Sequence, residues 1–398
     1  MHLSRLHAVF TRARRFFNTL MLLAGVNFIF SISLITTTFI NSSFLGQFFS
    51  PEAISLLYIA SSVLAIATMI AAPFIVGRLG VWKTLIISIL LLQILILFFG
   101  FAATTVAAGL FFMLRTLFAR MVPFLLDLYV EAQVKDESHT GNARGSYITG
   151  FSLGAVLGPI IASLLVFGTN YTPAYIFSAI ALTPLLWLVV VRLKKLTPTL
   201  PEPGHFIRSF KALWTCQTSV RYTMFIHLIF RATTIIYTIY VPLFLVQAGY
   251  SWQVIGIIIA IALIPYLVLE YPLGTIADKF LGEKELMITG LFILSFSTAA
   301  LSLVPVTYLT LWILPFIFTR VGAAFIEIST ESYFFKQVTE KDSALIGIFR
   351  MISPLAVITA PVVALVFLPI TDLQWLFGFI GATILIGVPL AQRIQDSR

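Results

Sequence analysis

The chain has 398 residues, of which 59% are hydrophobic and only 10% are charged. Soluble proteins carry about 25% charged residues, so this composition excludes a soluble protein of ordinary type and indicates a polytopic membrane protein. The net charge of +9 is spread through short polar segments, which argues against a nucleic-acid surface, and the single cysteine, Cys216, excludes an internal disulfide and a thiolate metal cluster. We therefore expect no metal site and no cofactor.

The first 15 residues carry four arginines and no acid, and we interpret them as a basic cytoplasmic arm, although a transit peptide has a similar composition. Apolar runs of about 20 residues, the length needed to cross a bilayer, then follow one another. We expect twelve spans, at residues 16–40, 53–76, 83–102, 105–130, 145–168, 172–191, 222–246, 253–273, 286–304, 308–333, 344–368 and 373–392.

The longest polar stretch, residues 192–221, contains several helix breakers and then a short amphipathic segment at 206–214. It divides the chain into two sets of six spans. The expected parts are the arm (1–15), an N-terminal six-helix bundle (16–191), a cytoplasmic linker (192–221), a C-terminal six-helix bundle (222–392) and a cytoplasmic tail (393–398).

The distribution of lysine and arginine predicts the orientation of the spans. Every basic residue outside the spans lies in the termini, in the linker or in every second loop. The alternate loops, at 41–52, near 103 and at 169–171, 247–252, 305–307 and 369–372, contain none. By the positive-inside rule, both termini and the linker are cytoplasmic, and we expect a multi-pass protein of the plasma (inner) membrane.

A pattern of charges in the fourth span is repeated in the tenth. Arg120, Asp127 and Glu131 recur 200 residues later as Arg320, Glu327 and Glu331, with spacings of i, i+7 and i+11 in both copies. At about 100° per residue, each set shares one helix face. A charge at the bilayer centre costs roughly 2.5–3.5 kcal/mol, so these side chains are expected to face one another, a cavity or the inner surface. A parallel repeat of six spans is typical of alternating-access transporters, whose site lies between the halves.

Two short loops carry a known family pattern. The loop after the eighth span, Gly274-Thr-Ile-Ala-Asp278-Lys279-Phe-Leu-Gly282-Glu-Lys284, resembles the loop signature of the major facilitator superfamily, with one residue inserted before the second glycine. The loop after the second span keeps Arg78 and Gly80 but has Gly77 at the position of the acid. With the twelve spans and repeated halves, the resemblance covers nearly the whole chain. It implies an all-α integral membrane fold of two pseudo-symmetric six-helix bundles.

In that superfamily, the charges of these loops hold the cytoplasmic side closed, and the resemblance implies such a gate here. The alternative is a solvated turn that only sets the topology. The candidate gate residues are Arg78 with Glu131 and Arg144, and Asp278 and Lys279 with Glu331 and Arg350.

The fifth span contains a series of small residues four positions apart, among them Gly154 and Gly158, followed by Pro159. Small residues let two helices approach closely, and proline bends a helix. The segment is similar to the Gly-Pro motif associated with antiporters of the superfamily, although Ala162 and Ser163 stand where two glycines are usual. Close packing and an antiport signal are both open interpretations.

Polar side chains within the spans are candidates for a substrate cavity. In the superfamily, the first, fourth, seventh and tenth helices line this cavity, and the candidates on them are Asn27, Ser31, Arg115, Arg231, Tyr237 and Arg320. An arginine there can bind an anionic substrate, or it can be neutralised by an acid and only fix the packing. We expect the cavity role for Arg231, which has no acid on its own helix, and give both roles equal standing for Arg120 and Arg320.

Three carboxyl groups in the inner half of their helices are candidates for proton coupling. The ionisation of such groups responds strongly to burial and to a neighbouring arginine. The candidates are Asp127, Glu270 and Glu327.

We expect a proton-coupled secondary transporter of a small organic solute, acting as a monomer in the lipid bilayer, with no nucleic-acid partner. Export of amphipathic compounds is the first alternative, because of the Gly-Pro element, and uptake or exchange of an organic anion is the second, because of the arginines. A transporter-like protein that only senses or scaffolds is a further alternative.

A membrane-embedded enzyme is the other rival class, but its reactive groups are lacking, because the histidines are dispersed and only one lies in a span. They are His2, His7, His139, His205 and, within a span, His227.

Overall fold

The computed structural model describes residues 21–133, 140–193, 213–279, 282–338 and 343–395. The first helix covers Met21–Leu45 and closes with the short helix α2 (Ile40–Leu45). The rest of the N-terminal half consists of α3 (Pro51–Leu79), α4 (Val81–Gly100), α5 (Thr105–Gln133), α6 (Thr140–Leu165) and α7 (Thr172–Val191). The C-terminal half consists of α9 (Thr218–Gln247), α10 (Trp252–Lys279), α11 (Glu283–Leu303), α12 (Leu309–Gln337), α13 (Ser343–Phe367), α14 (Leu373–Ile384) and α15 (Gly387–Gln392).

These helices have the lengths and apolar character of membrane spans. Ten of the described helices are long and apolar enough to cross a bilayer, and the apolar stretches Gly150–Leu165 of α6 and Trp252–Tyr266 of α10 add two shorter segments. The outward sides of α11 and α12 expose large apolar groups, such as Phe296 and Leu311, which are 64% and 60% exposed. Such surfaces are stable against lipid and not against water. The predicted fold class, an all-α membrane protein of twelve helices in two sets of six, is confirmed.

Short turns join successive helices, and their residues explain where the helices end. Gly80 has a φ of 81° and forms the whole connection between α3 and α4. A residue with a side chain would be strained in this conformation, so the glycine permits the reversal. At the other end of the bundle, Ser50 caps α3 by accepting a hydrogen bond from the backbone N–H of Ala53. The loop after the second span is therefore a tight turn at a single glycine.

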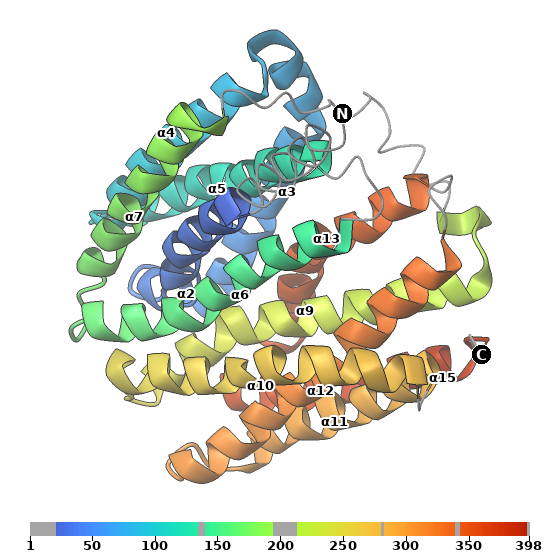
Figure 1. Ribbon diagram of the computed structural model, residues 1–398. Coiled ribbons are helices and arrows are strands. Elements are labelled where there is room, and N and C mark those ends of the chain that lie inside the picture. Colours follow the sequence, from blue (N-terminus) through green and yellow to red (C-terminus); the bar gives the residue numbers. More distant parts are fainter. Residues whose placement is uncertain (1–20, 134–139, 194–212, 280–281, 339–342, 396–398) are drawn as a thin grey trace, which may run out of the picture.

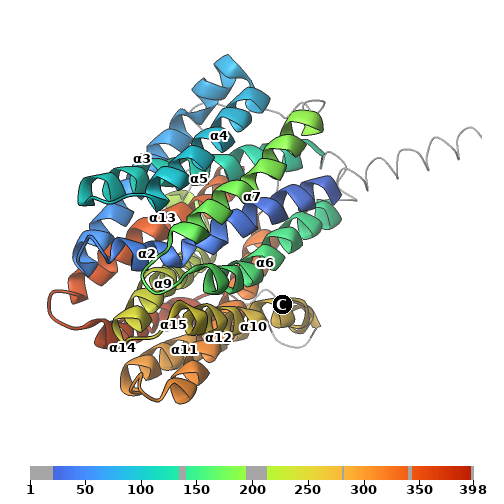
Figure 2. The ribbon, with the colours of Figure 1, turned by 90° about the vertical axis from the view of Figure 1, so that its left-hand side faces the viewer.

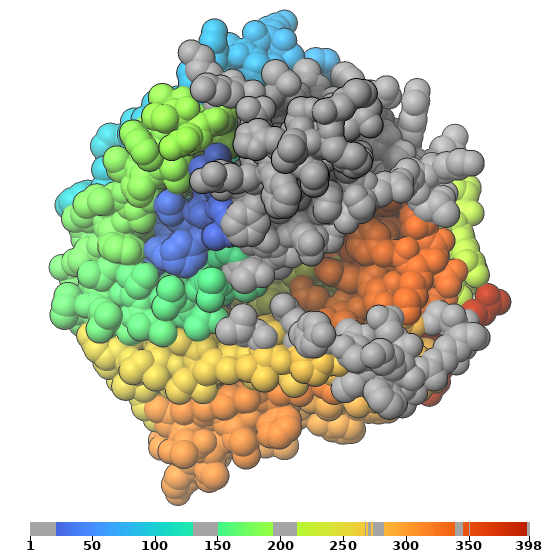
Figure 3. Space-filling model, viewed as in Figure 1, coloured from blue at the N-terminus to red at the C-terminus, as the bar shows by residue number. Residues whose placement is uncertain are grey.

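The two halves form two layers (Figure 1). In the side view, α3, α4 and α5 lie on one side of the molecule, and α10, α11 and α12 lie on the other (Figure 2). The halves meet where α6 packs on α10, α3 packs on α13 and α2 packs on α9. The space-filling view shows the first of these contacts, with α10 lying along α6 (Figure 3).

The two ends of the bundle differ in charge. We call the end at which α3, α5, α10 and α12 finish the basic end, because Arg78, Lys279 and Lys336 lie there. The end at which α4, α9 and α11 finish is the opposite end. Contacts described below are located by these two names.

The structural repeat differs from the repeat of charges in the sequence. Helices α5 and α12 start at Thr105 and Leu309, which are 204 residues apart, not 200. The structural equivalent of Arg120 is therefore Ala324, and Arg320 lies about one helical turn nearer the opposite end. Four residues rotate a helix position by only about 40°, so the two charged rows still occupy similar faces at different depths.

Candidate functional site

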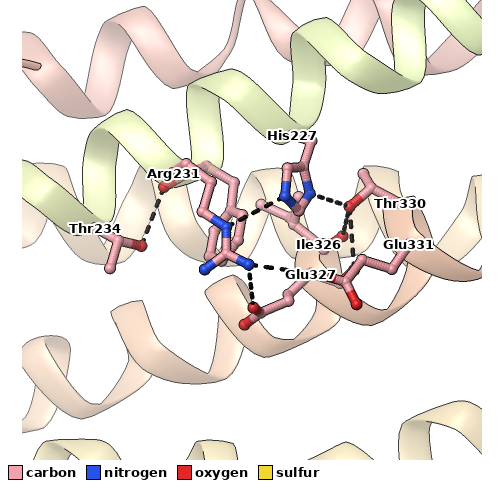
Figure 4. Close-up of polar contacts among 8 residues, drawn as sticks. His227, Arg231, Thr234, Ile326, Glu327, Thr330 and Glu331 are labelled. Atoms are coloured by element: carbon pink, nitrogen blue, oxygen red, sulfur yellow. Dashed lines mark hydrogen bonds and ion pairs between the residues drawn. The ribbon is translucent and has the colours of Figure 1, made fainter. Parts of the chain in front are cut away.

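A cluster of charged and polar side chains joins α9 to α12 in the interior of the C-terminal half. His227 and Arg231 are four residues apart on α9, and Glu327 and Glu331 are four residues apart on α12. Residues at this spacing lie one above the other on a helix face. The two faces oppose each other, and the four side chains point into the space between the helices (Figure 4).

Arg231 is the centre of this cluster. Its Nη2 lies 2.9 Å from Oε1 of Glu327 and 3.5 Å from Oε1 of Glu331, and its Nε donates a hydrogen bond of 3.2 Å to Nε2 of His227. The Arg231 and Glu327 side chains are only 30% and 22% exposed. Charge-assisted hydrogen bonds in such partly buried places are the strong ones, so the pair holds α9 and α12 together.

The contacts of His227 define its tautomer. An arginine N–H can only donate, so Nε2 of His227 is the acceptor, and Nδ1 carries the proton of the neutral ring. Nδ1 donates to Oγ1 of Thr330 over 2.8 Å, and that hydroxyl donates in turn to the carbonyl of Ile326 over 2.6 Å. The imidazole is only 2% exposed and lies against the ring of Phe349 at a centroid distance of 4.6 Å. In the neutral ring, Nδ1 is therefore the donor to Thr330 and Nε2 the acceptor from Arg231.

Arg320, on the same face of α12 as Glu327, has quite different surroundings. It is 1% exposed, and its Cζ lies over the rings of Tyr237 and Phe316, at 4.8 Å and 5.1 Å from their centroids. Its Nε has no hydrogen-bond partner, and no ion pair to it is found among the described residues. Arg320 is thus a buried cation that contacts aromatic rings and pairs with no acid among the described side chains.

Arg115 lies in the N-terminal half, where uncharged groups accept hydrogen bonds from its two terminal nitrogens, while its Nε has no hydrogen-bond partner. It donates to Oδ1 of Asn41 over 2.5 Å and to Oγ1 of Thr37 over 3.1 Å, and its Cζ lies 5.2 Å from the centroid of the Phe99 ring. The hydroxyl of Tyr175 also donates to Asn41, over 3.1 Å. These contacts tie α5 to the first helix and α7, which is a structural role.

Arg120 lies at the boundary between the halves. It lines a small pocket together with Ser62 and Met69 of α3 and Pro354 and Val357 of α13. This pocket is where the N-terminal half meets α13, so the two arginines of the sequence repeat occupy different surroundings.

The sequence did not indicate which acid pairs with which arginine. We expected a cavity role for Arg231, which has no acid on its own helix, and gave Arg320 a cavity role or pairing with an acid with equal standing. The structure instead pairs Glu327 with Arg231. Residues seven apart share a helix face but lie about 10.5 Å apart along the axis, so an acid on that face is reached from the neighbouring helix and not from its own.

Three other cavity candidates are placed as follows. Ser31 is fully buried and donates to the carbonyl of Phe151 over 2.7 Å, which joins the first helix to α6. Tyr237 forms a hydrogen bond with Thr298, so its hydroxyl is engaged, although its ring lies under Arg320. Asn27 is also buried.

Of the candidates for proton coupling and for the gate, Glu327 and Glu331 lie in the cluster around Arg231. Glu327 belongs to the cluster, Asp127 is exposed on α5, and Arg78 is exposed at the end of α3. Glu331 contacts Arg231, which was not among its expected partners. The side chains of Glu131, Arg144, Glu270, Asp278, Lys279 and Arg350 lie outside the described part of the structure.

The glycines of the fifth span are explained by close contacts. A Cβ added to Gly154 would lie 2.6 Å from Oγ of Ser31, and one added to Gly158 would lie 2.9 Å from the backbone carbon of Ile35. Both glycines therefore let α6 pack directly against the first helix. Pro159 lies at the contact with the other half, because its carbonyl oxygen would be 2.4 Å from a Cβ on Gly256.

At the opposite end, hydrogen bonds join the two halves. Oγ of Ser55 and the hydroxyl of Tyr240 are 2.6 Å apart. Nε1 of Trp252 donates to the Tyr171 hydroxyl over 3.2 Å. In addition, the Gln253 amide donates to the carbonyl of Val166 over 2.9 Å. The halves are therefore held together at this end, and we call these contacts the opposite-end gate.

The sequence did not single out His227 as a site residue. Its position four residues before Arg231, on the same face of a span, was the available signal. The missing information was the partner helix, since Thr330 lies 103 residues away.

Comparison with known proteins decides the family. A family model described as Major Facilitator Superfamily matches residues 16–326 and 253–394. The chain belongs to the Major Facilitator Superfamily. No curated protein sequence matches it significantly. As a member of this superfamily, it is a multi-pass membrane protein.

Solved transporter structures of the superfamily have the same fold. The nucleoside transporter NupG is 16% identical, with 94% of this chain and 98% of that one covered and a TM-score of 0.70. A POT family transporter in complex with a thioalcohol-conjugated peptide is 12% identical, with 95% of each chain covered and a TM-score of 0.75. A bacterial homologue of the human lysosomal transporter Spinster, in an inward-facing and unoccupied conformation, is 13% identical, with 95% and 92% covered and a TM-score of 0.67. This chain therefore has the Major Facilitator Superfamily transporter fold.

Proposed function

We propose that this protein is an alternating-access transporter that moves a small organic solute across a membrane and couples this movement to protons. The observation that carries the proposal is the charge held between α9 and α12, where the partly buried Arg231 pairs with Glu327 and the buried Arg320 pairs with no acid among the described side chains. Buried charges are often no more stabilising than well-packed apolar groups, so a bundle that served only as a scaffold would have little use for them. Their presence favours a solute pathway.

The same cluster argues against a membrane enzyme. A threonine beside a histidine can act as a nucleophile only when the histidine nitrogen facing it can accept a proton. Nδ1 of His227 already carries a proton and donates it to Thr330, and Nε2 accepts from Arg231. The imidazole is therefore arranged as a relay of hydrogen bonds and not as a base for the threonine.

The direction of access follows from combining charge with packing. By the positive-inside rule, the basic end faces the cytoplasm. The opposite-end gate then closes the outer side, and the buried cluster communicates with the cytoplasm. Rocking of the two halves would open this gate and close the basic end, as expected for two repeated bundles.

Glu327 and His227 are the groups that we assign to proton coupling. A proton on Glu327 would remove the negative charge that holds Arg231. A proton on Nε2 of His227 would prevent this nitrogen from accepting the hydrogen bond that Nε of Arg231 now donates to it. Either event releases Arg231. Protonation and the position of this arginine are thus linked by direct contacts.

Of the two solute classes, the organic anion has the better support. The preference for exporting amphipathic compounds depended on the glycines of the fifth span, and their contacts with Ser31 and Ile35 explain them as packing residues. A buried cation at Arg320, whose Nε lacks a hydrogen-bond partner, favours an anionic solute.

Flux through proteoliposomes tests the proposal. Purified protein is reconstituted, and currents are recorded on a solid-supported membrane after jumps of benzoate, succinate or tetraphenylphosphonium, with and without a pH gradient. We expect benzoate or succinate to give currents that a pH gradient enhances in the wild type. In Glu327→Gln, anion exchange should persist while the effect of the gradient is lost. A protein that binds these solutes but never moves them would contradict the transporter assignment.

A further inference from the structure

We propose that a groove between α11 and α12 binds one acyl chain of a phospholipid, in the leaflet at the opposite end. The groove has a volume of about 700 Å³, within the range of about 300–1,000 Å³ that is typical of ligand sites. Apolar side chains of both helices line it, among them Phe292, Phe296, Leu311 and Phe318. We call it the α11–α12 groove.

In the N-terminal half, two phenylalanines occupy the corresponding place. Helices α4 and α5 are the counterparts of α11 and α12 in the repeat of six spans, and a short connection joins the two helices of each pair. Phe98 of α4 stacks on Phe111 of α5, with ring centroids 5.3 Å apart and ring planes at 28°. The outward sides of α4 and α5 are therefore bridged by two large rings.

The α11–α12 groove lies where this pair of rings is missing. Ala300 is as far from the glycine that precedes α11 as Phe98 is from the glycine that precedes α4. Pro315 is as far from the first residue of α12 as Phe111 is from the first residue of α5. Ala300 and Pro315 both line the groove. The repeat thus supplies an internal comparison, in which two small side chains leave open a space that two rings fill in the other half.

The length of the groove corresponds to one leaflet. On α11 it extends from Phe292 to Val304, which is about 18 Å at 1.5 Å per residue. The hydrocarbon core of a bilayer is about 30 Å thick, so one acyl chain spans about 15 Å of it. Because α11 ends at Leu303, at the opposite end, the groove runs from that end to the middle of the bilayer. A chain whose headgroup lies at the opposite end has the matching length and direction.

The chemistry of the lining selects an uncharged chain. Among the described residues of the lining, the one polar side chain is Ser297, and its hydroxyl already donates to the carbonyl of Ile293 in its own helix. The turn at residues 304–308 contains no charged residue, so it offers no ion pair to a headgroup. The groove is also continuous with the lipid-facing surface, because Phe296 in its lining is 64% exposed on the side of the molecule away from the N-terminal half (Figure 2).

Packing holds the chain in the groove. An acyl chain that binds here exchanges one hydrocarbon environment for another, so it gains no hydrophobic free energy. A groove contacts the chain on several sides, whereas a convex helix surface contacts it on one, and the additional dispersion contacts accumulate. The rings of Phe292 and Phe296 stack with centroids 6.0 Å apart and planes at 10°, which makes this part of the lining rigid. The bound chain is therefore held longer than the lipid chains around it.

Photochemical labelling in vesicles tests the site. Full-length protein is reconstituted into palmitoyl-oleoyl phosphatidylcholine that contains some phosphatidylcholine with a diazirine in the middle of one acyl chain. After illumination, the labelled peptides are quantified by mass spectrometry. We expect several-fold more label on residues 292–318 than on the corresponding residues 90–114 of α4 and α5. Equal labelling of the two segments is ordinary lipid contact and overturns the proposal.

Two variants exchange the features of the halves. Ala300→Phe places a ring in the groove and should reduce the labelling of residues 292–318 several-fold, with residues 90–114 unchanged. Phe98→Ala with Phe111→Ala opens the corresponding space in the N-terminal half, so labelling of residues 90–114 should rise several-fold. The second variant tests the proposal even if the first does not fold. If a folded variant of either kind leaves the labelling unchanged, the groove is not the site.

A control variant and a second lipid identify the occupant. Ile257→Phe adds a ring at an exposed position of α10 outside the lining and should leave the labelling unchanged. Phosphatidylglycerol with the same diazirine chain should label the groove as phosphatidylcholine does, because no charge lines it. A several-fold preference for phosphatidylglycerol assigns the site to a headgroup. A dimer that Ala300→Phe dissociates, with no label in the groove, assigns it to a second copy of the chain. Either result overturns the acyl-chain proposal.

Discussion

At the scale of single residues, the C-terminal half holds two arginines in opposite electrostatic situations. Arg231 is partly exposed and shares its charge with two acids and a histidine. Arg320 is 1% exposed, lies against Tyr237 and pairs with no acid among the described side chains. Neutralising Glu327 would therefore weaken the hold on Arg231, whereas the rings around Arg320 carry no charge to lose.

The first prediction concerns the pair of Arg231 and Glu327. Replacing either residue alone with glutamine leaves a partly buried charge without its main partner, so each single variant should lose about 1–3 kcal/mol of stability. The double variant Arg231→Gln with Glu327→Gln should lose less than the sum of the two, because no charge is left unpaired. Melting temperatures of the three variants in one detergent, converted to free energies, measure the coupling. Strict additivity would show that the contact contributes nothing.

The second prediction concerns the hydrogen bond from His227 to Thr330. Thr330→Val keeps the shape of the side chain but removes the acceptor, so Nδ1–H of a 2% exposed imidazole is left unpaired. We expect a loss of about 1–3 kcal/mol in the stability of the protein. Thr330→Ser retains the hydroxyl and serves as the control, with a smaller loss. Equal melting temperatures for the valine variant and the wild type would mean that the imidazole finds another acceptor.

At the scale of the helices, the sequence predicted the spans well because the signal is local. Length and hydrophobicity are properties of a single segment, and the predicted 172–191 agrees with α7 at both ends. The contacts of the candidate site were less accessible, because they depend on which helix lies opposite. The stripe of charges on α12 was correctly placed on one face, but nothing within the helix indicated that Arg231 of α9 would face Glu327.

The charge repeat between the two halves likewise predicted positions on a helix but not contacts between helices. Matching identical charges at a separation of 200 residues aligned Arg120 with Arg320. The starts of the helices instead give 204 for α5 and α12. A displacement of one turn preserves the helix face but changes the depth and the neighbours. Sequence identity within a repeat therefore predicted the face of each arginine and not its partners.

The third prediction belongs to the packing of α6. A Cβ on Gly158 would lie 2.9 Å from the backbone carbon of Ile35, which cannot move without shifting the first helix. Gly158→Ala should therefore lower stability by about 1–3 kcal/mol. Gly77→Ala is the matched control, because nothing lies within 4 Å of its Cβ position, and alanine should stabilise α3 there by up to about 1 kcal/mol. The two melting temperatures should move in opposite directions. A shift in the same direction would show that local helix propensity, and not close packing, governs α6.

At the scale of the whole molecule, the polar contacts described between the halves gather at one end. Tyr240 and Trp252 reach across to Ser55 and Tyr171 at the opposite end. These are hydrogen bonds between neutral groups, each contributing about 0.5–1.5 kcal/mol. A small set of such bonds can be broken and reformed as the solute binds and leaves.

The last prediction tests whether this gate must open for transport. In a Cys216→Ser background, Ser163→Cys with Gly256→Cys places two thiols across the halves, because their Cβ positions would be 2.5 Å apart and a disulfide forms after a shift of about 1 Å. Because the Cβ on Gly256 would also lie 2.4 Å from the carbonyl oxygen of Pro159, the reduced double variant is first shown to fold and to transport. Oxidation should abolish flux and reduction should restore it. Ala299→Cys with Gly381→Cys is the control, since it joins α11 to α14 within one half, at a similar distance, and should leave flux unchanged when oxidised. If oxidation of the first pair left flux intact, the two halves would not separate at the opposite end, and access would have to alternate by movement inside one half instead.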